Sequence, residues 1–234
     1  MTTDIRRFSA GLLVLAVLLS ACATQPTSSS TTPATFTPIN NAVPDDLMTL
    51  EEQTEDIIDF VPSGDWPKVN ADISTIDQAW TTYQQDAVQD ETTQASQDSF
   101  LEALARLKSA SIAQDAIGTM QAANDLSATI MDMFDRYHPV IPTDIGRLDV
   151  LERQIILDVE KQDFSAAAET LAKINLVWEG IKPSVIAHNG NQEAAQFDES
   201  FATQVEALQA KKVTALTSEV RKGLEIVDAL EKVY

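Results

Sequence analysis

Apolar residues recur along most of this chain at alternating intervals of three and four positions, which is the spacing of one face of an α-helix. The clearest run spans residues 66–83, and a second run with the same spacing begins 98 positions later, at residue 164. The two runs align without a gap, in the pairs Trp66 with Phe164, Val69 with Ala167, Ile73 with Leu171, Ile76 with Ile174, Trp80 with Trp178, and Tyr83 with Ile181. We expect both runs to be helices, with Trp80 and Trp178 at the centres of two cores.

Further alignment of the chain with itself indicates that a whole helical unit occurs twice. The pairs in register at offsets of 98, 101 and 100 are, in that order, Val43-Pro44 with Ile141-Pro142, Phe100 with Phe201, and Phe134 with Tyr234. A three-residue insertion before the third helix of the second copy would explain the change of offset. We therefore predict a tandem duplication, with helical repeats at 43–134 and 141–234 and a linker at 135–140.

Each repeat is expected to hold four amphipathic helices joined by short connections. The first helix begins after Pro44 and ends at Pro62-Ser63-Gly64, and Asp65 caps the second helix. No segment alternates apolar and polar residues for long enough to indicate a strand. The predicted fold is all-α, a tandem duplication of an up-down four-helix bundle-like unit, and each copy is long enough to form a core of its own.

The boundary between the third and fourth helices is less strongly marked. Ser111 and Gln114 have the spacing of a capping box, which predicts a turn near residues 109–111 in the first repeat. In the second repeat, Ala210-Lys211-Lys212 carries no such signal. One continuous helix is therefore an alternative there.

Charge and cysteine content exclude several classes of protein. The chain carries 16 Lys and Arg against 36 Asp and Glu, a formal net charge of −20. Nucleic-acid binding is not expected, because it needs clustered cations against the phosphates. A single cysteine cannot form a disulfide within the chain, and one Cys with two His cannot build a Cys-rich zinc module. The hydrolase motifs G-x-S-x-G and H-E-x-x-H are absent, so we expect no catalytic residues and no enzymatic activity.

The first 22 residues have the layout of an export signal. Two arginines precede an apolar run from Phe8 to Leu19 that is too short to span a bilayer. The following sequence, Leu19-Ser20-Ala21-Cys22, resembles the lipobox of bacterial lipoprotein precursors. The resemblance implies cleavage before Cys22 and attachment of diacylglycerol to its thiol, whose two acyl chains suffice for a stable anchor. The alternative is an unlipidated signal peptide in which Cys22 is incidental.

The same resemblance divides the N-terminal region and implies a location. Residues 1–21 would be the signal peptide, and 22–42 the lipidated cysteine with an uncharged, Ser/Thr/Pro-rich tether that is too polar to fold by itself. The expected location is extracytoplasmic and membrane-anchored, either at the outer membrane facing the periplasm or on the outer face of the cell membrane.

Met131, Asp135 and His138 form the most suggestive cluster of metal-ligating side chains. On a helix that continues to Pro139 they would share one face, and a thioether with an imidazole suits copper. The alternative is that the methionines only fill the core. The predicted arrangement of helices is similar to that of extracytoplasmic imelysin-type bundles, which use a histidine with a nearby carboxylate. Neither His138 nor His188 begins an H-x-x-E motif. We expect His188 to be a solvated loop residue.

Arg147 and Arg153 place two cations in a helix that otherwise carries acids. Asp144 and Asp149 stand three and four positions before them, so surface or inter-bundle salt bridges are the first interpretation. A site for an anion or a partner protein at the two arginines is the alternative.

These features predict a lipid-anchored extracytoplasmic helical-bundle protein that acts as a binding or scaffolding module in the cell envelope. Its expected partners are the membrane, through lipidated Cys22, and another envelope protein; neither nucleic acid nor a cofactor is expected. The alternative function is a metal-ion (copper-type) binding lipoprotein that uses Met131, Asp135 and His138.

Overall fold

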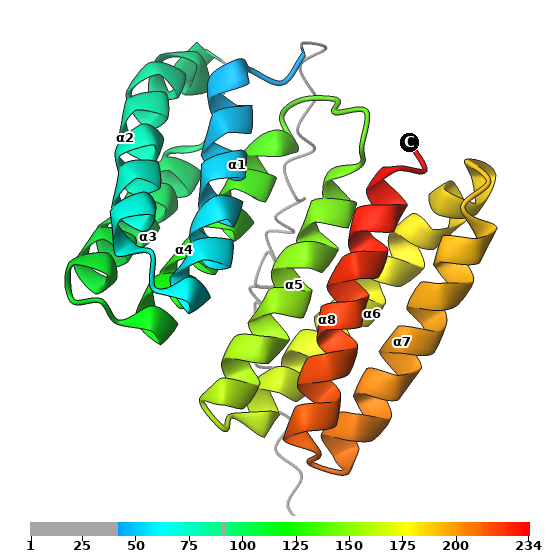
Figure 1. Ribbon diagram of the computed structural model, residues 1–234. Helices are drawn as coiled ribbons and strands as arrows, with labels where there is room; N and C mark the ends of the chain where they lie inside the picture. The colour runs from blue at the N-terminus through cyan, green and yellow to red at the C-terminus, as the bar shows by residue number, and fades with distance from the viewer. Residues whose placement is uncertain (1–41, 90–91) are drawn as a thin grey trace, which may run out of the picture. The chain divides into compact units, whose positions relative to one another are not determined.

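The computed structural model describes residues 42–89 and 92–234. In these two ranges the chain forms α-helices and one short 3-10 helix, without a strand (Figure 1). The elements are α1 (Asp45–Phe60), η1 (Val61–Ser63), α2 (Trp66–Gln89), α3 (Gln94–Ile112), α4 (Ala116–Phe134), α5 (Thr143–Glu160), α6 (Phe164–Ala187), α7 (Asn191–Gln209) and α8 (Val213–Glu231). The prediction of an all-α fold is confirmed. None of the helices in the described ranges is both long and apolar enough to cross a bilayer.

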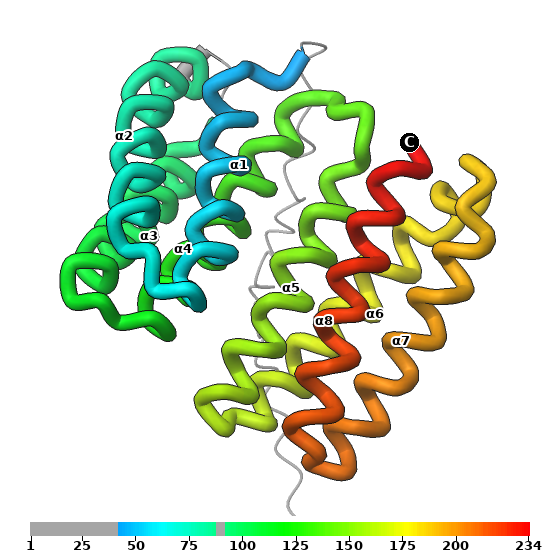
Figure 2. Tube along the Cα trace, in the orientation of Figure 1, coloured from blue at the N-terminus to red at the C-terminus, as the bar shows by residue number. Residues whose placement is uncertain are grey.

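The helices form two four-helix groups. In the first, α1 packs against α2 and α4, and α3 packs against the same two helices; α5 to α8 repeat this arrangement. Figure 2 shows consecutive helices running in opposite directions within each group. Helix α4 also packs against α5, so the two bundles share an interface.

Each bundle has its own hydrophobic core with a tryptophan at its centre, as predicted. The indole of Trp80 stacks on Phe100 with ring centroids 4.1 Å apart, and Trp178 lies 4.5 Å from Phe197. All four rings belong to the buried clusters of their bundles. One residue of α5, Val150, is buried in the first core, because α5 packs against α4.

The first two helices of each bundle begin where the sequence predicts. Asp65 accepts a hydrogen bond from the backbone N–H of Lys68 at 3.1 Å, at the start of α2. Before it, Gly64 ends the 3-10 helix in the left-handed region, at φ 74°. This conformation favours glycine, which explains why Pro62-Ser63-Gly64 separates α1 from α2.

The prediction of a capping box at Ser111 and Gln114 is wrong. Ser111 lies within α3, where it is buried and its hydroxyl donates to the side-chain oxygen of Asn70 at 3.0 Å. The turn is at 113–115, and Asp115 caps α4 by accepting from the N–H of Gly118 at 3.1 Å. The continuous helix considered for the second repeat is also wrong, because α7 and α8 are separate.

Both turns are Schellman motifs that use a residue other than glycine. Gln114 and Lys211 each have φ 52°, in the left-handed region. After Lys211, the N–H of Lys212 donates to the carbonyl of Ala207 at 2.9 Å, which satisfies an otherwise unpaired carbonyl at the helix end. Because glycine usually occupies this position, the sequence carries no clear stop signal here.

The helix boundaries also correct the alignment of the two halves. Helices α5 and α6 begin 98 positions after α1 and α2, but α7 and α8 begin 97 positions after α3 and α4. The proposed offsets of 101 and 100 are therefore wrong, as is the insertion in the second copy. Phe197, not Phe201, takes the place of Phe100 against the tryptophan. The tandem duplication itself stays a prediction.

Candidate functional site

The residues predicted to bind copper do not share one helix face. Helix α4 ends at Phe134, so His138 lies beyond it in the connection to α5, where it is exposed. Met131 is buried in the first core, and Asp135 binds Arg147. Among residues 42–89 and 92–234, no group of three or more His, Cys, Asp and Glu side chains is arranged to hold a metal ion. The geometric basis of the copper prediction is therefore wrong, and metal binding itself stays a prediction.

Cys22, the predicted lipidation site, lies outside the described residues, as do the predicted signal peptide and nearly all of the tether. His188 directly follows α6 and is exposed, as predicted. Its Nδ1 lies 2.9 Å from the carbonyl oxygen of Ser184, and its ring lies 4.5 Å from that of Tyr234.

Arg147 makes the predicted salt bridge and two more. Its guanidinium lies 3.0 Å from a carboxylate oxygen of Asp144, 2.5 Å from Asp135 and 3.2 Å from Asp132. Burial opposes the charge of Arg147, but the hydrogen bond with Asp135 and the other carboxylates raise its pKa. The contacts of Arg147 with Asp132 and Asp135 join the end of α4 to the start of α5. Since three carboxylates already surround the guanidinium, an incoming anion would have to displace one of them.

Arg153 makes a salt bridge between the two bundles. It lies 2.5 Å from Asp149, its predicted partner one helical turn earlier, and 3.0 Å from Glu55 of α1. The salt-bridge interpretation of both arginines is confirmed. Burial raises the pKa of Asp149, an effect that the Arg153 guanidinium opposes.

Glu51 and Glu231 add further carboxylates to the surroundings of Arg153. Burial, and then the neighbouring charges of Glu55 and Glu231, raise the pKa of Glu51 to about 7. The pKa of Glu231 is raised by burial and by Glu55 as well. Within the described ranges no cation lies within salt-bridge distance of Glu51 or Glu231. Arg153, together with Lys232 beside Glu231, therefore offsets only part of the negative charge of these acids.

These carboxylates line a cavity of about 520 Å³ at one end of the interface between the bundles. Its walls come from α1, the end of α4, the connection 135–142, the first turns of α5 and the last residue of α8. Two lining residues, Gly146 of α5 and Met131 of α4, mark a close approach of these helices, since a Cβ at Gly146 would lie 2.5 Å from the sulfur of Met131. The polar side chains in the lining are Glu51, Glu55, His138, Thr143 and Glu231.

The remaining wall of the cavity is apolar and open to solvent. Met48 is 46% exposed and Val140 is 79% exposed, and Ile141 beside it is also exposed. Large apolar side chains gathered at a concave site are typical of binding surfaces, whereas single exposed ones are common anywhere. The cavity therefore combines an apolar wall with carboxylates, of which Glu51 and Glu231 have no salt-bridge partner among the described residues.

A fully buried carboxyl lies in the core of the α5–α8 bundle. Glu152 is 0% exposed, and its Oε1 accepts a hydrogen bond from the amide nitrogen of Gln204 at 3.0 Å. A Cβ at Gly223 would lie 2.8 Å from the same oxygen, so only glycine leaves room there. Burial raises the pKa of Glu152 to about 8. Glu152 does not line the cavity, so we assign it to the core of the second bundle and not to the site.

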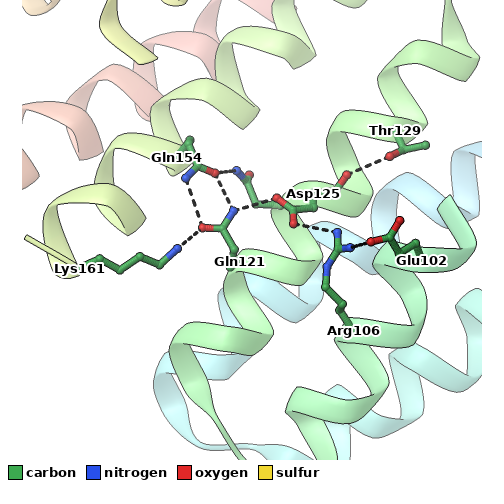
Figure 3. A network of polar contacts seen from close by, with 8 residues as sticks. Glu102, Arg106, Gln121, Asp125, Thr129, Gln154 and Lys161 are labelled. Carbon is green, nitrogen blue, oxygen red and sulfur yellow. Dashed lines mark hydrogen bonds and ion pairs between the residues drawn. The ribbon is translucent and has the colours of Figure 1, made fainter. Parts of the chain in front are cut away.

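Amide side chains join α4 to α5 across the interface between the bundles. Figure 3 shows Gln121 of α4 and Gln154 of α5 donating to one another, with nitrogen–oxygen distances of 2.8 and 3.3 Å. Lys161 donates to Gln121, and Gln121 also donates to Asp125, which in turn binds Arg106 at 3.1 Å. This network holds α4 against α5, and both helices contribute residues to the lining of the cavity.

The sequence indicated only some of these residues. Arg147 and Arg153 were found because their partners stand one helical turn away. Glu152 had a readable signal, since it interrupts the apolar stripe Ile145, Leu148, Ile155 of α5, all of which are buried. Glu51 had none, because its burial depends on α8 and on the connection after α4.

No protein-family model matches this chain, and no curated protein or solved structure is significantly similar to it.

Proposed function

We propose that the two bundles form a binding module for a small amphipathic ligand, with its site in the cavity between α1, α4, α5 and α8. The observation that carries this proposal is the combination of exposed Met48, Val140 and Ile141 with half-buried carboxylates in one concavity. Its volume of about 520 Å³ falls in the range of small-molecule sites, about 300–1,000 Å³.

The proposal also includes a place in the cell envelope. The lipobox resemblance at Leu19-Ser20-Ala21-Cys22 supports a lipid anchor on Cys22, and the uncharged residues after it support a flexible tether. Without Asp4, Arg6 and Arg7 of the signal peptide the chain carries 35 acids and 14 bases, and this net charge of −21 would keep the tethered bundles away from anionic lipid. In this proposal the module is extracytoplasmic and takes up its ligand at the membrane surface or passes it to another envelope protein.

A neutral fluorescent probe tests the binding site. N-phenyl-1-naphthylamine is titrated into the fragment 23–234, which retains all residues of both hydrophobic cores. We expect one saturable site in the natural sequence. The variant Met48→Asp should lose it, because a carboxylate then replaces part of the apolar wall.

The matched control is Ile112→Asp. Ile112 is 82% exposed and lies outside the cavity lining, so this variant should bind the probe as the natural sequence does. Circular dichroism confirms that both variants fold. No saturable binding, or equal binding by Met48→Asp and the natural sequence, would contradict the proposed site.

A further inference from the structure

We propose that the cavity selects organic cations with an apolar body. The positively charged group would lie against Glu51, Glu55 and Glu231, and the apolar body against Met48, Val140 and Ile141. The inference rests on the proposed binding function and adds the chemical class of the ligand.

The charges that line the cavity argue for a cation. Three carboxylates from two helices face it. Of the neighbouring cations, Arg153 already binds Glu55 and Asp149, and Lys232, which follows Glu231 in the chain, is exposed and outside the lining. Glu51 and Glu231 lack a salt-bridge partner among the described residues. An anion placed here would be repelled by these acids, whereas a cation would supply the charge that they lack.

The chemistry of the wall argues for an organic cation and against a metal ion. Oxygen-binding metal ions need several carboxylates converging on one point, and no such group exists in the part of the chain that the structure describes. The carboxylates here lie instead beside Met131, Phe134 and Ile141, which would contact hydrocarbon. A quaternary ammonium ion or a protonated primary amine with an alkyl or aryl body would contact both the carboxylates and the apolar residues of the lining.

Binding of a cation should also displace a proton. The pKa of Glu51, raised to about 7 by burial and neighbouring acids, means that this group is largely protonated at pH 6 and largely ionised at pH 8. A cation binds the ionised form, so its affinity should increase by up to about tenfold from pH 6 to pH 8. The charged or titratable groups near Glu51 are Glu52, Glu55, Arg153, Glu231 and His138.

Two probes of opposite charge and equal chain length test the selectivity. Decyltrimethylammonium and decyl sulfate, each below its micelle concentration, are titrated calorimetrically into the fragment 23–234 at pH 8. We expect saturable 1:1 binding of the cation and at least about tenfold weaker binding of the anion. Similar affinity for the two probes overturns the inference.

Variants of Glu51 and its neighbours test the mechanism. Glu51→Gln should weaken cation binding about tenfold at pH 8 and should remove most of the dependence on pH. Glu52→Gln is the matched control, since Glu52 is the next residue of α1 but is exposed and outside the lining. His138→Asn should keep the pH dependence. If Glu51→Gln binds like the natural sequence, or if the pH dependence disappears in His138→Asn instead, the inference is wrong.

The two proposals can fail separately. If N-phenyl-1-naphthylamine binds and is lost in Met48→Asp while the two charged probes bind equally, the site stands and its selectivity for cations is refuted. If neither the neutral nor the charged probes bind, the cavity is not a ligand site and both proposals fail.

Discussion

Replacing Glu152 by glutamine should change how the stability of this protein depends on pH. Glu152 is fully buried in the second bundle, and only one of its carboxyl oxygens has a hydrogen-bond partner, the amide nitrogen of Gln204 at 3.0 Å. The other oxygen, Oε2, and the amide oxygen of Gln204 are both buried without a partner. A protonated Glu152 can donate from Oε2 to such an acceptor, whereas an ionised one cannot.

The direction of the effect follows from the raised pKa. Burial, chiefly, raises the pKa of Glu152 from 4.5 to about 8 in the folded protein. Between these two values the folded state holds a proton that the unfolded state has released. The free energy of unfolding therefore falls as pH increases through this window, by about 1.4 kcal/mol for each full pH unit. From pH 5 to pH 8 the contribution of Glu152 amounts to about 3 kcal/mol, because proton uptake is incomplete at both ends.

Glu152→Gln removes this contribution and keeps the shape of the side chain. The new amide can donate to Gln204 and accept from it at any pH. We expect the variant and the natural protein to differ by less than about 1 kcal/mol at pH 5. At pH 8 the variant should be more stable by about 3 kcal/mol, which corresponds to roughly 10 °C in melting temperature for a domain of this size.

Urea unfolding of both proteins at pH 5, 6, 7 and 8, followed by circular dichroism, measures the difference. Asp149 and Glu51 also have raised pKa values, so both proteins should lose stability as pH increases, and only their difference reports on Glu152. Glu169→Gln, at an exposed position of α6, is the control and should change little at any pH. A difference between Glu152→Gln and the natural protein that is constant from pH 5 to pH 8 would refute the reasoning.

Three further predictions concern the fold and the anchor. Gln114→Gly should raise the free energy of unfolding by about 0.5–1 kcal/mol, because Gln114 has φ 52° and glycine adopts this conformation without strain; a loss of stability in urea unfolding would contradict this. Trp178→Ala should lower it by about 3–5 kcal/mol, since Trp178 is buried against Phe197 and its indole N–H binds Asp198 at 2.8 Å; a change below 1 kcal/mol would show that the second core does not depend on it. Cys22→Ser should abolish incorporation of radiolabelled palmitate in bacteria expressing the full chain, and equal labelling of the two proteins would exclude Cys22 as the acylated residue.

The helices and their assembly into bundles could be predicted because the information is local. The spacing from Trp66 to Tyr83 defines a buried face directly, and Asp65 and Gly64 define its start. The boundary between α3 and α4 was misplaced because Gln114 occupies the left-handed position that usually holds glycine.

The register of α7 was wrong for a different reason. Phe197 and Phe201 stand one turn apart on the same side of the helix, so matching aromatic residues cannot distinguish them. Only the packing shows that Phe197 contacts Trp178.

The candidate site depends on contacts between residues that are distant in sequence. Its carboxylates come from both ends of the described chain, Glu51 in α1 and Glu231 at the end of α8. Each stands on an ordinary amphipathic helix, and nothing in its neighbours along the chain indicates burial. Local pairs such as Arg153 with Asp149 were predictable, whereas the contact of Arg153 with Glu55, 98 residues away, follows only from the docking of the bundles.

The most direct test of the ligand site uses the methionine methyl groups as reporters. The fragment 23–234 contains four methionines, of which Met48 and Met131 line the cavity while Met120 and Met133 do not. Their ¹³C-labelled methyl signals can be followed by NMR during a titration with decyltrimethylammonium. We predict saturable shifts for Met48 and Met131, with Met133 unchanged. Shifts confined to Met120 or Met133, or no shift at all, would contradict the assignment of the cavity as the ligand site.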